Sequence, residues 1–193
     1  MRYKVKHKFF VRIFAMYQQV LDFWFNEISP KMWWQKDLAF DAEIVRRFGA
    51  LHQQAVLGEL FEWREHAESS LAEVIVLDQF SRNIYRDTPQ AFAADPLALV
   101  LAQQAIKNGF DKLVEVDRRS FFYLPFMHSE SKRIHEEAVK LYTAHGNENN
   151  LEFELKHKVI IDKFGRYPHR NEILGRESTQ EEIAFLQEPN SSF

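Results

Sequence analysis

The segment from Leu71 to Arg86 changes character half-way along. Residues 71–77 are apolar around nearly the whole circumference of a helix, which is typical of a helix in the middle of a core. The polar residues of the second half are Asp78, Gln79, Arg82, Asn83 and Arg86. At about 100° per residue, Asp78, Arg82 and Arg86 share one stripe of the helix. The pattern predicts a central helix whose polar end either holds the fold together or lines a site.

Hydrophobic residues recur at helical spacing through most of the remaining chain. The pattern predicts further helices over residues 17–28, 38–56, 97–106, 128–145 and 151–164. Asp37 is expected to cap the helix that follows it, and Gly165 to end the helix before it. Ser69 or Ser70 is expected to cap the central helix.

Three further helix starts are marked by local signals. Thr88 before Pro89 and Asp95 before Pro96 each place a capping side chain ahead of a proline, which is favoured at the first helical position. Thr179 followed by Glu182 has the spacing of a capping box.

No stretch alternates with period two for long enough to predict a strand. About eight to ten helices joined by short connections indicate an all-α fold, a helical bundle or superhelix of antiparallel helix pairs. No fixed-period repeat is visible in the sequence, and residues 16–193 are expected to form a single domain.

Composition narrows the function classes. The chain has no cysteine, which excludes a disulfide framework and a thiolate nucleophile and fits a reducing compartment, so we expect a cytoplasmic protein. A net charge of -3 gives no general attraction to nucleic acid or to an anionic membrane. No apolar run approaches the roughly 20 residues needed to span a bilayer. We expect neither nucleic acid nor membrane as a partner, and the oligomeric state is left open.

The first 15 residues differ from the rest. They carry Arg2, Lys4, Lys6, Lys8 and Arg12, and no acidic residue appears before Asp22. Arg12 interrupts the apolar run that a secretory signal needs. A basic amphipathic surface anchor or a transit-like segment is one interpretation. We favour the other, a basic extension ahead of a domain that begins at Met16.

The polar stripe of the central helix has two interpretations. Asp78 and Arg82 have the favourable order for an i,i+4 ion pair, so the stripe is either a ladder that locks helices together or part of a binding site. Two arginines against one aspartate leave a positive charge that needs another acid, such as Glu130, or an anionic ligand. Guanidinium groups suit carboxylate or phosphate.

Residues His128, Ser129 and Glu130 form the second polar cluster. One interpretation is a helix start, with Ser129 as cap and Glu130 near the positive end of the helix. The other is a general acid or base beside the arginines. His157 shares a helix face with apolar residues and is expected to point inward. The spacing of the histidines matches no HExxH motif, and neither a metal nor a cofactor is expected.

The third cluster is FGRYPHRN, residues 164–171. It has the form of a helix end, with Gly165 in the left-handed conformation and Pro168 preventing continuation. Positive charge is favourable there, but the density of donors, continued by Arg176, also suits the second wall of an anion pocket. The candidate ligand-binding residues are Asp78, Gln79, Arg82, Asn83, Arg86, Arg166, Arg170 and Asn171. The candidates for proton transfer are His128, His157, His169 and Glu130.

Three motifs together, LDQFSRNIYRDTPQAFAADPLAL, FFYLPFMHSE and FGRYPHRN, resemble the bacterial "domain of unknown function" family nine-two-four. The likeness covers roughly residues 16–186. It implies an all-α fold like the tetratricopeptide-repeat superhelix without recognisable repeats, and it implies no activity. Many members have a glutamine where this chain has Ile134-His135.

Three functions fit these features. The first is a pocket for an anionic small molecule, in which Asp78, Arg82, Arg86, Arg166 and Arg170 converge and a histidine moves a proton. The second is a helical-repeat-like module whose arginines clamp a peptide carboxylate. The third is purely structural, with the polar residues satisfying one another. The sequence favours the first and does not decide whether the protein is an enzyme.

Overall fold

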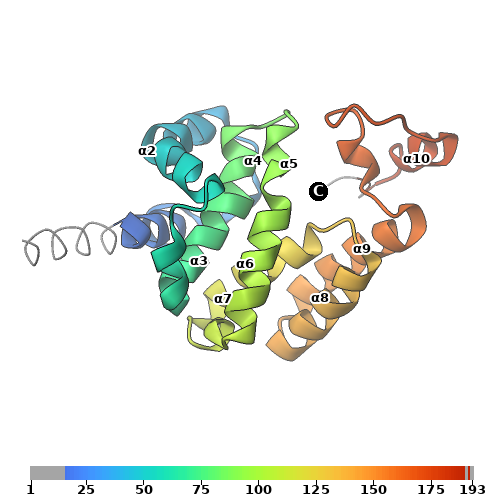
Figure 1. Ribbon diagram of the computed structural model, residues 1–193. Coiled ribbons are helices and arrows are strands. Elements are labelled where there is room, and N and C mark those ends of the chain that lie inside the picture. Colours follow the sequence, from blue (N-terminus) through green and yellow to red (C-terminus); the bar gives the residue numbers. More distant parts are fainter. Residues whose placement is uncertain (1–15, 190, 192–193) are drawn as a thin grey trace, which may run out of the picture.

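The computed structural model describes residues 16–189 and 191, and within them it is all-α, with no strand (Figure 1). The basic extension predicted for residues 1–15 lies outside the described residues. A helix over residues 16–22 continues into a π-helical turn, η1. The remaining elements are η1 (Phe23–Glu27), η2 (Pro30–Trp34), α2 (Leu38–Val56), η3 (Phe61–Glu65), α3 (Ala67–Ile75), η4 (Val76–Phe80), α4 (Ser81–Ile84), α5 (Gln90–Ala93), α6 (Asp95–Lys107), η5 (Phe110–Lys112), α7 (Val116–Met127), α8 (Lys132–His145), α9 (Glu148–Phe164), η6 (Pro168–Arg170) and α10 (Gln180–Phe185).

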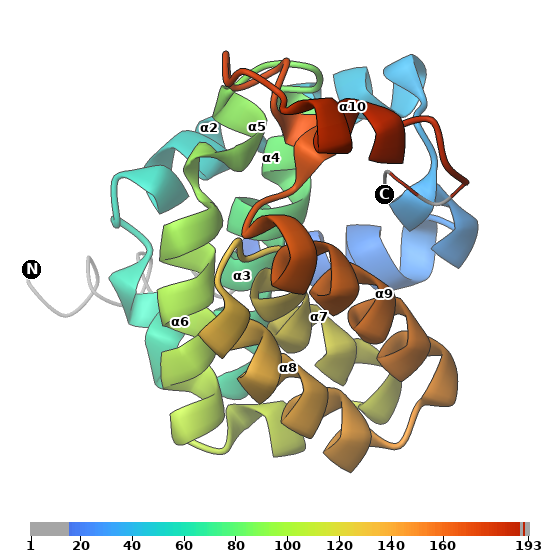
Figure 2. The same cartoon turned by 90° about the vertical axis from the view of Figure 1, so that its right-hand side faces the viewer.

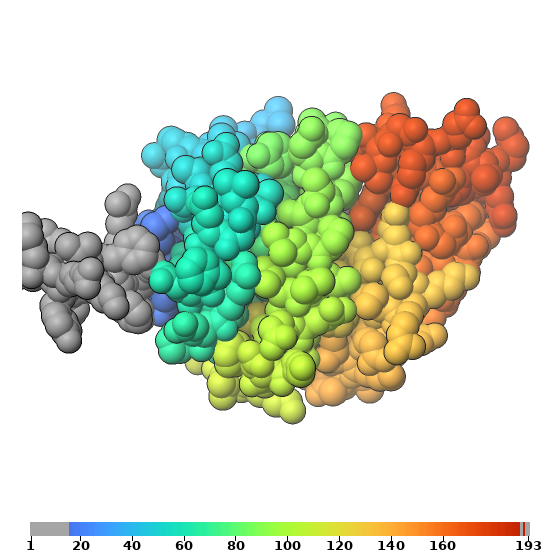
Figure 3. Space-filling view, in the orientation of Figure 1, coloured from blue at the N-terminus to red at the C-terminus, as the bar shows by residue number. Residues whose placement is uncertain are grey.

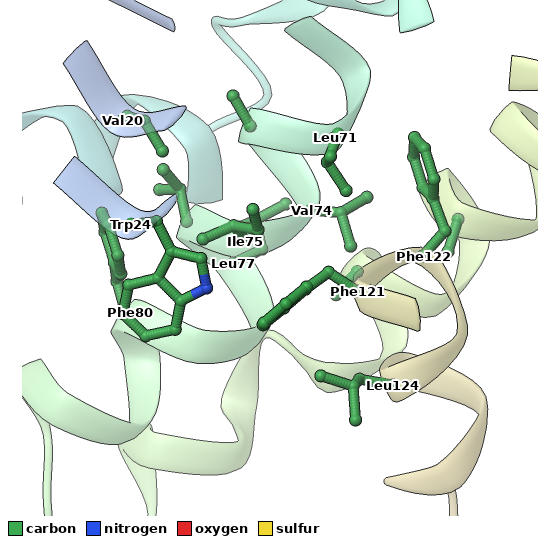
Figure 4. Packing of buried hydrophobic residues seen from close by; sticks show 14 of the residues in the cluster. Val20, Trp24, Leu71, Val74, Ile75, Leu77, Phe80, Phe121, Phe122 and Leu124 are labelled. Carbon is green, nitrogen blue, oxygen red and sulfur yellow. The ribbon is translucent and has the colours of Figure 1, made fainter. Parts of the chain in front are cut away.

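The central helix occupies the core as its pattern predicted. Every residue from 69 to 81 is buried, because apolar side chains on all sides of this helix meet other elements. Figure 4 shows Leu77 and Phe80 near Trp24 of η1, with Phe121 of α7 close by. The rings of Trp24 and Phe80 meet edge-on with their centroids 5.4 Å apart, a favourable aromatic geometry.

The central helix is not one continuous α-helix. It runs as α3, then as a single π turn, η4, and then as α4, which ends at Ile84 rather than at Arg86. It begins at Ala67, so Ser69 and Ser70 lie inside its first turn and do not cap it; both hydroxyls donate to the carbonyl of Trp63 instead. The π turn contains Asp78 and changes the angular spacing of the residues after it.

The later helices follow one another in space. Helix α7 packs on α6 and α8, and α8 packs on α9, so consecutive helices lie side by side (Figure 2). In Figure 1, α4 and α5 stand between α2 and the C-terminal segment that carries α10. This order agrees with the predicted antiparallel pairs, whereas the tetratricopeptide-like superhelix stays a prediction.

Several helix ends follow their sequence signals and others do not. The carboxylate of Asp37 accepts from two backbone N–H groups, Gly165 ends α9 at φ 70°, and Thr179 with Glu182 forms the capping box. Thr88 caps no helix, because its hydroxyl donates to the carbonyl of Tyr85, and Asp95 lies within the first turn of α6.

The His128 region was predicted wrongly as a helix start. Helix α7 continues through Pro125 to Met127 and ends at His128, and α8 begins only at Lys132. Helix α9 likewise begins at Glu148, three residues before the predicted start, with the side chain of Asn147 as its cap. His128 and its two neighbours therefore lie in a connection, where side chains are free to face a pocket.

Candidate functional site

A pocket of about 370 Å³ lies where three segments meet, a size typical of small-molecule sites. The segments are α5 with the start of α6, the connection from α7 to α8, and the chain after α9. In Figure 3 the green residues of α5 and α6 border the yellow and orange-red residues of the other two segments. One part of the lining is apolar: Pro89, Phe92, Ala93, Pro96, Leu99, Pro125 and Leu174. The polar part is Asp95, His128, Ser129, Glu130 and Arg170.

His128 is held against the pocket by a buried carboxylate. Its Nδ1 lies 2.8 Å from Oδ1 of Asp78, which is only 1% exposed and also accepts a 2.6 Å bond from Gln79. Because an ionised carboxylate only accepts hydrogen bonds, Nδ1 carries the proton and Nε2 carries a lone pair. No described residue hydrogen-bonds to Nε2. This nitrogen is therefore left for a ligand or a reacting proton.

The electrostatics of this pair favour a charged aspartate and a neutral histidine near pH 7. Burial works against ionisation of Asp78. The positive charges of His128, which is protonated at acid pH, and of Arg82 outweigh burial and lower the pKa of Asp78 to about 2. Burial and the charge of Arg82 lower the pKa of His128, and Asp78 offsets this only in part. A neutral imidazole with a carboxylate behind it is the arrangement of a general base.

Two arginines share one carboxylate at the start of α6. The Nη1 and Nη2 atoms of Arg82 donate to the two oxygens of Asp95 at 2.9 and 3.1 Å, and its Nη1 also donates to the Asp78 carbonyl at 2.6 Å. Arg170 reaches the same carboxylate with Nη1 alone, at 3.3 Å. Arg82 is thus well compensated, and Arg170 is not.

Arg170 is buried with donors to spare. Its guanidinium lies 4.6 Å from the ring centres of both Phe92 and Tyr167, so two aromatic faces hold it in place. Its buried Nε has no hydrogen-bond partner among the described residues, and the side chain is only 7% exposed. Burial and the neighbouring Arg82 lower the pKa of Arg170, as expected for a cation that is incompletely compensated.

Glu130 closes the pocket on the side of the C-terminal segment. It accepts 2.6 and 2.9 Å bonds from Arg176 and a 2.8 Å bond from the N–H of Tyr167. Burial opposes ionisation of Glu130, but these hydrogen bonds outweigh it and lower the pKa. Arg176 also donates to Asn171, which ties this candidate residue to the wall without placing it in the pocket.

The convergence expected from the sequence is partial. Asp78, Arg82, His128, Glu130 and Arg170 come together. Two other candidate arginines do not join them. Arg86 donates to Asp41 at 2.8 Å beside Asn83, and Arg166 donates to Glu182 at 2.6 and 2.8 Å.

The reasons for this separation are local. Helix α4 ends at Ile84, so Arg86 leaves the stripe that it shares with Arg82 on an ideal helix. The left-handed Gly165 and the single turn η6 turn Arg166 and Arg170 to different sides. Spacing along the sequence therefore could not show that Arg170 rather than Arg166 lines the pocket.

The two remaining candidate histidines stay neutral at physiological pH. Burial lowers the pKa of His157 to about 3 and that of His169 to about 4. His157 points inward, as predicted, and its Nδ1 lies 2.8 Å from the carbonyl of Phe153. Neither residue lines the pocket.

A second histidine–carboxylate pair was not predicted from the sequence. His135 and Glu154 are fully buried, with Nδ1 2.7 Å from Oε1, and Nε2 lies 2.9 Å from the carbonyl of Ser129. Burial raises the pKa of Glu154. The two residues lie on consecutive helices at inward-facing positions, which is a weak signal in a sequence with eight histidines.

His52 and Ser81 also lie in contact. Their residue types suit a base and a nucleophile, but the hydrogen bond between them runs in the wrong direction for this chemistry. Ser81 Oγ donates to the Leu77 carbonyl at 2.5 Å, so it accepts the 2.7 Å bond from His52 Nε2. The histidine nitrogen therefore carries a proton and cannot take one from this hydroxyl. Ser81 is also fully buried, and we assign the pair a structural role.

The comparisons with known proteins agree with this fold. The model of the family described as "Bacterial protein of unknown function (DUF924)" matches residues 20–190. The chain belongs to this family. The solved structure of a protein of unknown function from Agrobacterium tumefaciens is 43% identical to this chain, with a TM-score of 0.86, and the match covers 90% of this chain and 97% of that one. No curated protein matches the chain.

Membership of DUF924 confirms the resemblance seen in the three motifs, and the family description carries no activity. None of the helices in the described ranges is both long and apolar enough to cross a membrane. Across those ranges no three His, Asp or Glu side chains are grouped so that they could hold a metal ion. The chemistry of the pocket has to be inferred from its own residues.

Proposed function

We propose that this protein binds a small molecule bearing a carboxylate or phosphate group, with Arg170 as its main anion ligand. One observation carries the proposal. Arg170 is a buried guanidinium on the wall of a pocket, held by two aromatic rings, with an unpartnered Nε and one long bond to a carboxylate. A buried donor without a partner costs about 1–3 kcal/mol, and an anion bound by the remaining N–H groups of this guanidinium would compensate its charge.

Each wall of the pocket has a role in this proposal. Arg82 holds Asp95 in place, and Asp78 orients His128 so that Nε2 remains available. The apolar wall around Phe92 and Leu99 takes the body of the ligand. Because His128 has the form of a general base, hydrolysis of phosphate or carboxylate esters is the first reaction class to assay.

The two other functions receive less support. A pocket of about 370 Å³ suits a small molecule better than the extended groove that a peptide needs. The tight carboxylate pairs of Arg82, Arg86 and Arg166 do favour a structural role for these three residues. Arg170 is the residue that the structural explanation leaves without a sufficient partner.

Calorimetry with inorganic phosphate and with benzoate tests the proposal. Arg170→Gln is expected to weaken binding about 10- to 100-fold, because a charge-assisted hydrogen bond contributes about 1.5–3 kcal/mol. Arg166→Gln is the matched control, since this arginine lies four residues away and pairs with Glu182 outside the pocket. Failure of the wild type to bind either anion, or equal binding by both variants, would overturn the proposal.

A further inference from the structure

We infer that an anionic ligand enters the pocket together with one proton, which Nε2 of His128 takes up. The inference rests on the proposed function and adds to it how binding depends on pH. It follows from the charges around the pocket, from the direction of the hydrogen bond to Asp78, and from the presence of His128 in the lining of the pocket.

The formal charges of the unliganded network sum to zero, although Arg170 itself makes only one long bond to a carboxylate. Its carboxylates are Asp78, Asp95 and Glu130, and its guanidinium groups are Arg82, Arg170 and Arg176. With His128 neutral, three negative charges face three positive ones. A ligand with one negative charge therefore gives the site a net charge of about -1. An uncompensated charge is costly in these largely buried surroundings.

His128 is the group placed to restore the balance. Asp78 faces it from η4, Arg82 from α4, Asp95 from α6 and His157 from α9, while Glu130 and Arg170 share the pocket with it. His157 stays neutral and does not compete for the proton, because burial lowers its pKa to about 3. His128 is also the only described histidine that lines the pocket.

Protonation at Nε2 turns this nitrogen from an acceptor into a donor. In the free protein, burial and Arg82 lower the pKa of His128 and keep the imidazole neutral. A bound anion beside Nε2 favours the charged form and raises that pKa again. The proton and the ligand therefore bind together and leave together, and affinity falls as the pH rises above the pKa of the liganded site.

Isothermal titration with benzoate tests this inference. Benzoate keeps a single negative charge above about pH 6, as expected for a carboxylic acid with a pKa near 4, so the ligand does not itself titrate. Titrations at one pH in two buffers of unlike protonation enthalpy count the protons taken up. We expect close to one proton per benzoate, and an affinity that falls up to about tenfold per pH unit on the alkaline side.

A variant assigns the proton to its site. His128→Gln is expected to bind benzoate with an affinity independent of pH and with equal heats in the two buffers. His169→Gln is the matched control and should keep the proton uptake of the wild type, since His169 does not line the pocket. The wild-type titration alone suffices should His128→Gln fail to fold.

The outcomes separate the two proposals. Absence of benzoate and phosphate binding to the wild type overturns the proposed function and this inference together. Binding that depends on Arg170 but gives equal heats in both buffers overturns this inference alone. Proton uptake that persists in His128→Gln also overturns it, because another group then takes the proton.

Discussion

Two histidine–carboxylate pairs in this protein have nearly the same geometry and opposite electrostatics. His128 lies 2.8 Å from Asp78, and His135 lies 2.7 Å from Glu154. The pKa of Asp78 is lowered to about 2, because His128, Arg82 and hydrogen-bond donors outweigh burial, whereas burial raises the pKa of Glu154. The contact distance does not decide the protonation state; the neighbouring donors and charges do.

The pairs also differ in the proton at the second ring nitrogen. Nε2 of His135 faces the Ser129 carbonyl, which only accepts, so Nε2 carries a proton in either protonation state of the pair. If Glu154 is ionised, Nδ1 carries one as well. The His135 pair therefore holds one proton more than the His128 pair, and it is sealed from solvent. In the His128 pair, Nε2 is left without that proton, and His128 lines the pocket.

The largest expected difference between the pairs is in stability. Asp78→Asn should lower the free energy of unfolding by about 3 kcal/mol, because it leaves buried cationic groups with one carboxylate fewer. Glu154→Gln should cost only about 1 kcal/mol, because the amide NH2 can donate to Nδ1 of neutral His135 and burial already disfavours the charged form of Glu154. Chemical denaturation at pH 7 measures both. Equal losses would show that the two carboxylates contribute equally to the free energy of unfolding.

The dependence of stability on pH should also distinguish the pairs. The folded pKa of Asp78 lies below its ordinary value of 3.8, so its contribution is present above that value and is lost as the pH falls toward about 2. The loss amounts to about 2–3 kcal/mol. It should appear in acid titrations of the wild type and be absent from Asp78→Asn.

Glu154 should show the opposite sign. Its folded pKa is raised, so its contribution is present below the ordinary value of 4.5 and is lost as the pH rises through the folded value. The stability of Glu154→Gln relative to the wild type should therefore improve between pH 4 and pH 7. A constant difference across this range would contradict the raised pKa.

The sequence allowed the core and the general place of the site to be predicted, but not its pairings. The apolar circumference of residues 71–77 was sufficient to place that helix in the core, because burial follows directly from side-chain type. Asp95 was interpreted as a helix cap, and this local role was enough to account for an aspartate before Pro96 without any contact to a distant arginine. Its contacts with Arg82 and Arg170 depend on how α4, α6 and η6 meet, which spacing along one segment does not encode.

The same limit applies to the stripe on the central helix. At 100° per residue, Asp78, Arg82 and Arg86 align, but the π turn at η4 and the end of α4 at Ile84 break the alignment. In the sequence, His135 stands out only as a departure from the family, because many members have a glutamine where this chain has Ile134-His135. It became visible as half of a buried pair only once α8 and α9 were placed together.

Removing the shared carboxylate should strengthen anion binding. Asp95→Asn takes a negative charge away from Arg170 and from the ligand, so benzoate affinity should rise about tenfold while stability falls. Asp41→Asn is the matched control, because it removes the carboxylate of Arg86 in the same kind of cluster and should lower stability without changing affinity. Weaker binding by Asp95→Asn would show that this carboxylate contacts the ligand as an acceptor.

The smallest expected effect concerns Tyr167, which contacts both the His135 pair and Arg170 on the wall of the pocket. Its hydroxyl donates to the carbonyl of Met127 and lies 3.2 Å from His135 Nε2, while its ring stacks on Arg170 at 4.6 Å. Tyr167→Phe should lower the free energy of unfolding by about 1 kcal/mol and leave benzoate affinity within about twofold, because the ring remains. Denaturation and titration of one preparation measure both quantities.

Tyr142→Phe is the control for Tyr167→Phe, because the buried hydroxyl of Tyr142 has no hydrogen-bond partner among the described residues. Its removal should leave stability unchanged or raise it, since a buried donor without a partner is costly. If Tyr167→Phe instead weakened benzoate binding as much as Arg170→Gln, the hydroxyl would be positioning the guanidinium. The His135–Glu154 pair and the pocket would then belong to one network. His128 and His135 would differ because of their positions in that network and would not have separate roles.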